Sequence, residues 1–118
     1  MAFKLGGEKR GLKHSGNVSI VRTPLDKGTI AEANNDGTIS IDPSIEPGSA
    51  LYKKAVKHEM VHMEQMESGR ADYGDNWVMW EGKVYLRKSG YIDGPNGRWP
   101  EGHPNHPWEA EAIEAEKE

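Results

Sequence analysis

The sequence predicts an α+β fold in which a small antiparallel sheet of hairpins packs on two helices. Three observations indicate this class: short alternating segments flank turn residues, one amphipathic stretch runs from Ala50 to Ser68, and a second helical stretch closes the chain. A chain of 118 residues has room for one core. We expect residues 1–16, which mix Gly, Lys and Arg without periodicity, to form a loosely ordered arm, and residues 17–118 to form a single domain.

The first third of the domain has the pattern of a sheet. Residues Asn17–Arg22 alternate between apolar and polar side chains, as a strand does. Gly28–Ala33 and Gly37–Asp42 flank an Asn-Asn-Asp sequence, and such a turn between two alternating runs is typical of a hairpin.

A long helix follows. Ser49 can cap its first turn, and Gly69 is placed to end it, so the helix should span Ala50–Ser68. At about 100° per residue, His58 and His62 share a stripe with apolar side chains, while lysines lie opposite. The helix should therefore be half buried, with both histidines facing inward.

The second half of the chain returns to strands and then to a helix. Trp77–Trp80 and Lys83–Arg87 are separated by Glu-Gly and predict a second hairpin. Residues 90–107 are rich in Gly, Pro and Asn, and we expect an ordered loop there. Pro107 suits the first position of a helix that runs from Trp108 to about Lys117.

The sequence His58-Glu-Met-Val-His62 is the main chemical signal. Histidines four apart on a helix lie on one face and can bind one metal ion, and Glu59 can reach a water whose pKa that metal lowers. This HExxH arrangement predicts zinc held by the two histidines and Glu59 as general base for attack on a carbonyl. The metzincin continuation is excluded, because Gln65 and Ser68 stand where its glycine and third histidine would be.

A catalytic zinc ion takes three protein ligands, so a third must come from elsewhere in the chain. Asp72 and Asp75 follow the motif, but their surroundings match an aspartate-completed site only in part. Glu109 is the better candidate, because the last helix can stand beside the first and point a carboxylate at the metal. Glu111 is its alternative, since helical geometry turns only one of the two toward the ion.

With Glu109 on a later helix, the HExxH segment resembles the gluzincin metallopeptidases, especially the minimal forms encoded by bacteria and their phages. The resemblance covers roughly residues 28–115 and includes a hairpin before the motif and Gln65 three residues after it. It implies a zincin-like fold, bound Zn²⁺ and peptide-bond hydrolysis, with His58, His62 and Glu109 as metal ligands.

The chain departs from the gluzincin pattern at Ile113, where the family commonly has an Asp that accepts a hydrogen bond from a ligand histidine. Such an acceptor fixes the tautomer and orientation of the ring. Asp72, Asp75 or Glu111 could take over this task.

Hydrolysis also needs a donor for the oxyanion that forms on water addition. Among the Tyr and His residues outside the motif, His103 ranks first and Tyr91 second, because zincins usually supply this donor from the region before the second helix. Zincins also present a strand to which substrate pairs, and we expect Lys83–Arg87 or Gly37–Asp42 to act in this way.

Composition limits the partners. The chain has no cysteine, its net charge is −4, and the acidic balance gathers in residues 101–118, which is not the basic surface of a nucleic-acid-binding protein. No apolar run is long enough for a membrane span, and the first ten residues lack the pattern of a signal peptide, so a cytoplasmic protein is expected, with association with a phage particle as a further option.

A peptide or protein substrate is expected. Because so short a chain has little room for the far wall of the cleft, either the substrate is held loosely or a partner protein completes the site. Three alternatives stay open: a non-catalytic zinc-binding protein, such as a component of a phage particle; a hydrolase of cell-wall peptides; and a metal-free protein in which His58 and His62 pair with carboxylates inside the core.

Overall fold

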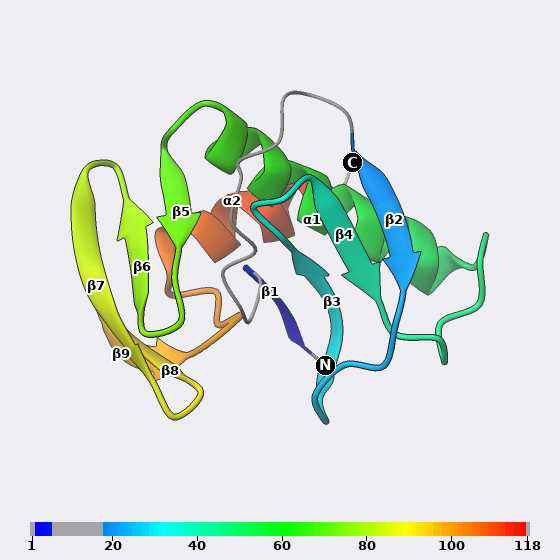
Figure 1. Ribbon diagram of the computed structural model, residues 1–118, viewed down its shortest axis with the longest axis horizontal. Helices are drawn as coiled ribbons and strands as arrows, with labels where there is room; N and C mark the ends of the chain where they lie inside the picture. The colour runs from blue at the N-terminus through cyan, green and yellow to red at the C-terminus, as the bar shows by residue number, and fades with distance from the viewer. Residues whose placement is uncertain (1, 6–17, 118) are drawn as a thin grey trace.

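The computed structural model describes residues 2–5 and 18–117. In this part of the chain, nine strands form a four-stranded and a five-stranded sheet, and the two helices pack against each other. Figure 1 shows the two sheets side by side, with helix α1 behind the four-stranded sheet. The predicted α+β class is confirmed.

The four-stranded sheet has the order β1-β3-β4-β2. Strands β3 (Thr29–Ala33) and β4 (Thr38–Ile41) form the predicted antiparallel hairpin. Strand β2 (Ser19–Arg22) pairs in parallel with β4, and β1 (Ala2–Leu5) pairs in parallel with β3. The sheet is therefore mixed rather than purely antiparallel.

The expected arm differs from the structure at its start, because Ala2–Leu5 are strand β1 rather than a loose segment. The backbone of β3 offers a free edge to these residues, and pairing along that edge satisfies hydrogen-bonding groups of both segments. Residues 6–16 of the arm lie outside the described part of the chain.

The turn of the first hairpin is built by its own side chains. Asp36 Oδ1 accepts hydrogen bonds from the Thr38 backbone N–H at 3.1 Å and from the Thr38 hydroxyl at 2.6 Å. Gly37 has a φ of +91°, a conformation that glycine adopts without steric cost.

Helix α1 (Ala50–Glu67) begins at the predicted residue and ends one residue before the predicted end, Ser68, which is its C-cap. Ser49 Oγ accepts a hydrogen bond from the Tyr52 backbone N–H at 3.1 Å and so caps the first turn. Gly69, with a φ of +81°, follows the last turn. The predicted inward face is confirmed, since both histidines of the motif are buried.

The five-stranded sheet has the order β5-β6-β7-β8-β9, and every neighbouring pair in it is antiparallel. Strands β6 (Trp77–Trp80) and β7 (Lys83–Lys88) form the second predicted hairpin. Strand β5 (Ala71–Tyr73), only three residues long, was not predicted.

The expectation of a loop over residues 90–107 is wrong for much of that segment. Strands β8 (Tyr91–Gly94) and β9 (Gly97–Pro100) form a third hairpin there. Gly94, Pro95, Asn96 and Gly97 form the tight turn between these strands, where such residues are preferred, whereas Gly102, Pro104 and Asn105 lie in the segment after β9.

This hairpin changes the expectation for substrate pairing. Strand β7 has neighbours on both sides, β6 and β8, and β4 lies between β3 and β2. Neither Lys83–Arg87 nor Gly37–Asp42 is therefore an edge strand, and the prediction that one of them pairs with substrate is wrong. In the described chain, the sheet edges are β1, β2, β5 and β9.

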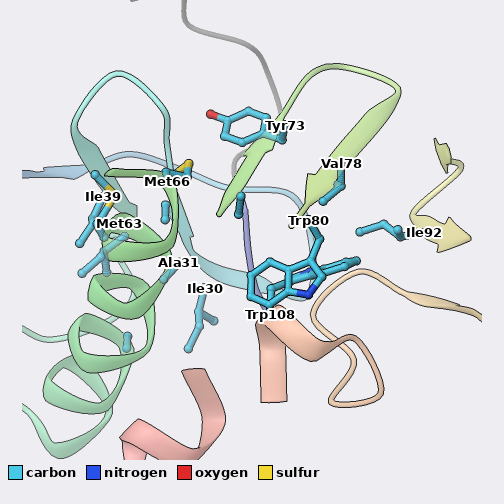
Figure 2. Close-up of a cluster of buried hydrophobic side chains, with 14 of the residues drawn as sticks. Ile30, Ala31, Ile39, Met63, Met66, Tyr73, Val78, Trp80, Ile92 and Trp108 are labelled. Carbon is cyan, nitrogen blue, oxygen red and sulfur yellow. The ribbon is translucent and has the colours of Figure 1, made fainter. Parts of the chain in front are cut away.

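Helix α2 (Pro107–Glu116) starts with Pro107, as predicted, and contacts the five-stranded sheet through one large side chain, Trp108. Trp108 is 1% exposed, and its ring lies 5.9 Å from that of Trp80 and 6.4 Å from that of Tyr85. Figure 2 shows Trp108 next to Trp80, with the two rings tilted against each other, while Met63 and Met66 of α1 lie next to Ile39. Large rings thus make up much of a small core, as the composition suggests.

Candidate metal centre

Helices α1 and α2 bring the three predicted ligand residues together. His58 Nε2 lies 2.8 Å and His62 Nε2 lies 3.0 Å from the same oxygen, Glu109 Oε1. The three candidate ligand atoms all lie within 4.8 Å of one another, and each side chain is at most 1% exposed. Two imidazole nitrogens and one carboxylate oxygen at such spacing can hold a divalent metal ion.

Local structure explains how each ligand reaches this point. His58 and His62 stand one turn apart on α1, and their ring centroids are 5.0 Å apart. Glu109 lies in the first turn of α2, where the helix dipole favours a negative charge. The two helices pack against each other, so the carboxylate faces both rings.

Each histidine also has a partner at its other ring nitrogen. His58 Nδ1 lies 2.5 Å from Glu116 Oε2, in the last turn of α2. His62 Nδ1 lies 2.8 Å from Gln65 Oε1, one turn further along α1. These contacts leave the Nε2 atoms of both rings directed at Glu109, which is the arrangement that a shared metal ion requires.

The residues expected to support the histidines are therefore not the ones found in contact with these rings. Asp72 Oδ1 instead accepts hydrogen bonds from the Asn35 side chain at 3.2 Å and from the Tyr73 backbone at 2.8 Å. The carboxylate found in contact with the ring of His58 is that of Glu116, which lies about one turn beyond Ile113 along α2.

Gln65 is held on both sides. Its amide nitrogen donates to the Trp108 carbonyl and to Glu111 Oε1, each at 3.1 Å. Glu111 in turn pairs with Arg70 at 2.6 Å. This bond to Arg70 is the main reason that the pKa of Glu111 is lowered. The alternative ligand Glu111 thus lies outside the group of three and orients Gln65.

Glu59 is the unusual residue of the site. Its side chain is fully buried, and neither carboxylate oxygen has a hydrogen-bond partner among the described residues. Burial raises its pKa well above the ordinary value, and the negative charge of Glu109 adds to this effect, while His62 opposes it. A buried carboxyl group without a partner destabilises a fold, so its presence beside three candidate metal ligands indicates a role in binding or chemistry.

His62 and Glu109 form a strongly interacting pair. Burial alone lowers the pKa of His62, but the charge of Glu109 and the hydrogen bond to it outweigh burial and raise that pKa. Burial likewise raises the pKa of Glu109, yet the two histidines together lower it below its ordinary range. In the metal-free protein, the pair therefore favours a protonated His62 beside an ionised Glu109.

The two predicted oxyanion donors have contacts of their own. Tyr91 of β8 is 42% exposed, and the guanidinium group of Arg98 lies 4.8 Å from its ring centroid. The ring of His103 stacks on Trp99 at 4.6 Å, and its Nδ1 accepts a hydrogen bond from the Asn105 backbone N–H at 3.0 Å. Their role as oxyanion donors stays a prediction.

His106 is a further buried histidine, at the start of α2. It occupies the N-cap position of α2 without capping it, and its ring stacks on Trp108 at 4.8 Å. Its Nε2 lies 3.1 Å from the Trp99 carbonyl, and burial lowers its pKa, which favours the neutral ring.

A surface groove lies outside the group of ligands. It has a volume of about 420 Å³ and includes Trp80, Tyr85, Pro95 and Pro107 in its lining. No ligand residue of the metal centre lines it.

Comparisons with protein-family models, curated proteins and solved structures find no match to this chain. Neither α1 nor α2, the helices in the described part of the chain, is long and apolar enough to cross a membrane.

Proposed function

We propose that this chain is a zinc-dependent metallopeptidase in which Glu59 is the general base. One observation supports this above all: a fully buried carboxylate without a hydrogen-bond partner stands on the same helix as two histidines that converge with Glu109. A purely structural metal site has no need of such a group, because an apolar side chain would fill the space at lower free energy.

The residues fit a zinc ion. Zinc takes imidazole nitrogen and carboxylate oxygen readily, and a chain without cysteine has these donors to offer. His58, His62 and Glu109 would hold the ion. When bound, zinc polarises a carbonyl and lowers the pKa of water.

Glu59 would handle the proton. In the metal-free protein, burial favours the protonated form of Glu59. The positive charge of a bound ion would favour the carboxylate, and in this buried place that carboxylate would accept a proton from the attacking water and return it to the leaving amine. His58 directly precedes Glu59 on α1 and His62 follows three residues later, so the carboxyl group stays next to the two histidine ligands. Removal of such a base typically costs about 10²–10⁴-fold in rate.

The test uses the full chain with one equivalent of zinc and an unfolded protein as substrate, with cleavage followed by mass spectrometry. Glu59→Gln should retain zinc and lose cleavage by about 10²–10⁴-fold. Glu64→Gln is the matched control, because Glu64 is exposed on the same helix and should leave the rate unchanged. Cleavage that persists in Glu59→Gln, or that a chelator does not stop, would refute the proposal.

A second candidate function is a non-catalytic metal-binding protein, and the burial of the whole site favours it. All three ligand residues are at most 1% exposed and Glu59 is fully buried, whereas a catalytic metal needs an open position for substrate. Under this hypothesis the wild-type chain binds one equivalent of metal and gains stability from it, but cleaves no peptide. A component of a phage particle is one setting for such a protein.

The peptidase proposal requires that substrate reach this buried site. The groove next to Trp80 and Pro107 lies beside the start of α2, only two residues before Glu109 in sequence. A partner protein that covers this side, or a movement of the segment before α2, would provide the second wall of a cleft. The target could be a cytoplasmic protein or a cell-wall peptide, and cleavage assays with both would separate them.

A further inference from the structure

We propose that Glu116 is the positioning residue that prepares His58 for metal binding, so that α2 holds both ring nitrogens of this histidine. The inference rests on the metal site of the proposed function and extends it to the far end of α2. Glu109 and Glu116 are seven residues apart, which is about two helical turns, so they share one face of α2. The ring of His58 lies between them, with Nε2 at 2.8 Å from Glu109 and Nδ1 at 2.5 Å from Glu116.

The two carboxylates compete for one proton. A neutral imidazole carries a single N–H, on either Nδ1 or Nε2. If the proton sits on Nε2, it satisfies Glu109 but blocks the nitrogen that must bind metal. If it sits on Nδ1, it is donated to Glu116 and leaves the Nε2 lone pair directed at Glu109 and His62. Glu116 therefore favours the tautomer that can bind metal.

The carboxylate of Glu116 is held in position by neighbouring side chains. Lys54 Nζ lies 3.4 Å from its other oxygen, Oε1, so that the ammonium group and the imidazole take one carboxylate oxygen each. The side chain of Glu116 is 8% exposed and that of His58 is 1% exposed. A hydrogen bond between an imidazole and a carboxylate in so dry a place is directional and strong, and it increases the basicity of the ligand nitrogen.

His62 provides an internal comparison. Its Nδ1 faces the neutral amide oxygen of Gln65, which accepts a hydrogen bond but carries no charge. The centre thus has one histidine supported by a carboxylate from α2 and one supported by an amide from its own helix. Loss of Glu116 would leave Glu109 as the charged acceptor for the ring proton of His58. The tautomer with its proton on Nε2, which cannot bind metal, would then become more populated.

The experiment measures zinc affinity by competition with a chromophoric chelator, with the wild-type chain beside three variants. Glu116→Ala should weaken zinc binding by about 10–100-fold, the usual effect of losing the partner of a ligand histidine. Glu116→Gln keeps an acceptor without charge and should fall between Glu116→Ala and wild type. Glu114→Ala is the matched control, because Glu114 is exposed in the same part of α2 and pairs with Lys117.

The visible spectrum of the cobalt-loaded protein reports the ligand geometry independently of affinity. At saturating cobalt, Glu116→Ala should show altered band positions and Glu116→Gln a spectrum closer to wild type, which a residue that only stabilises the fold would not cause. Melting of the metal-free variants in EDTA checks folding, and Glu116→Gln carries the test if the Ala variant does not fold.

The outcomes separate this inference from the proposed function. Wild-type affinity in Glu116→Ala, or equal weakening in Glu114→Ala, would overturn the role of Glu116 and leave the peptidase proposal intact. Weakened binding in Glu116→Ala, together with a wild-type chain that cleaves nothing, would support the inference and refute the peptidase. A wild-type chain that binds no metal would overturn both.

Discussion

Replacement of Glu59 by methionine should make the metal-free protein more stable while it abolishes hydrolysis. Both carboxylate oxygens of Glu59 are buried without a partner among the described residues, and such a group costs about 1–3 kcal/mol when neutral and more when charged. Methionine is unbranched, of similar length and free of polar atoms, so it should recover about 1–3 kcal/mol of unfolding free energy. For a chain of this size, that gain corresponds to a rise in Tm of about 4 °C per kcal/mol.

The gain should also depend on pH, with a sign that follows from the raised pKa of Glu59. Because burial raises this pKa above the ordinary value of 4.5, the folded state prefers the protonated carboxyl. The wild-type protein therefore loses stability as pH rises from about 4.5, where an unfolded Glu ionises, up to the higher pKa of the folded state. Methionine does not titrate, so its advantage over wild type should grow from pH 4.5 toward neutral pH.

The assay is urea unfolding in EDTA at pH 4.5 and pH 7.5, followed by tryptophan fluorescence. Glu64→Met on the exposed face of the same helix is the matched control and should change stability by less than about 0.5 kcal/mol. If Glu59→Met lowered the unfolding free energy as an ordinary core substitution does, Glu59 would be a satisfied structural group, and the main argument for a general base would fail.

Three further predictions concern the metal and the buried polar groups. EDTA should lower the Tm of the zinc-loaded protein by roughly 10 °C, because zinc at 100 times its Kd adds about 2.7 kcal/mol of unfolding free energy. In calorimetry, His62→Ala should show no such shift in Tm, and an equal shift in both proteins would contradict the assignment of His62 as a metal ligand. Gln65→Leu should lower the unfolding free energy by about 2–4 kcal/mol in urea, since the ring N–H of His62 and the Trp108 carbonyl would lose their partner. A loss below about 0.5 kcal/mol would show that the hydrogen bonds of Gln65 do not stabilise the fold. The lowered pKa of His106 keeps its ring neutral in the folded state, while an unfolded His takes up a proton near pH 6.5, so the protein loses stability as pH falls below that value. His106→Phe should therefore lose less unfolding free energy than wild type between pH 7.5 and pH 5.5. Identical losses in both proteins would refute a buried, neutral His106.

The parts of the fold that depend on neighbours in sequence could be predicted. Ser49 and Gly69 bound α1 through contacts within one turn of its ends. The hairpin turn at Asp36 and Gly37 is also local, because side chains and backbone of the same few residues stabilise it. The spacing of His58 and His62 places them on one face of any helix, whatever the rest of the chain does.

The parts that depend on distant pairing could not be predicted. The parallel pairing of β1 with β3 joins segments more than 20 residues apart, and nothing in the residues of β1 specifies that neighbour. Residues 91–100 have an alternating pattern around Pro95 and Asn96, but the density of turn residues hid the two short strands. Pairing with β7 then stabilises these strands along its second edge.

The hydrogen-bond partners of the two histidines also differ in whether the sequence could predict them. Gln65 lies three residues after His62, so their contact follows from helical spacing and could have been predicted. Glu116 lies 58 residues from its partner His58, and its contact requires the position of α2 along α1 to be known within one turn. A family pattern pointed to position 113, where this chain has Ile, and helix packing rather than sequence spacing identifies the residue in contact.

The position of these groups along α2 links metal binding to the fold as a whole. Glu109 lies in its first turn and Glu116 in its last, so one ring, that of His58, meets both ends of the helix. A shift of α2 by one residue along its axis would move both carboxylates by about 1.5 Å and lose both contacts together. Metal binding should therefore stabilise the whole helix rather than its first turn alone, because the ion fixes Glu109 and the tautomer that it selects fixes Glu116.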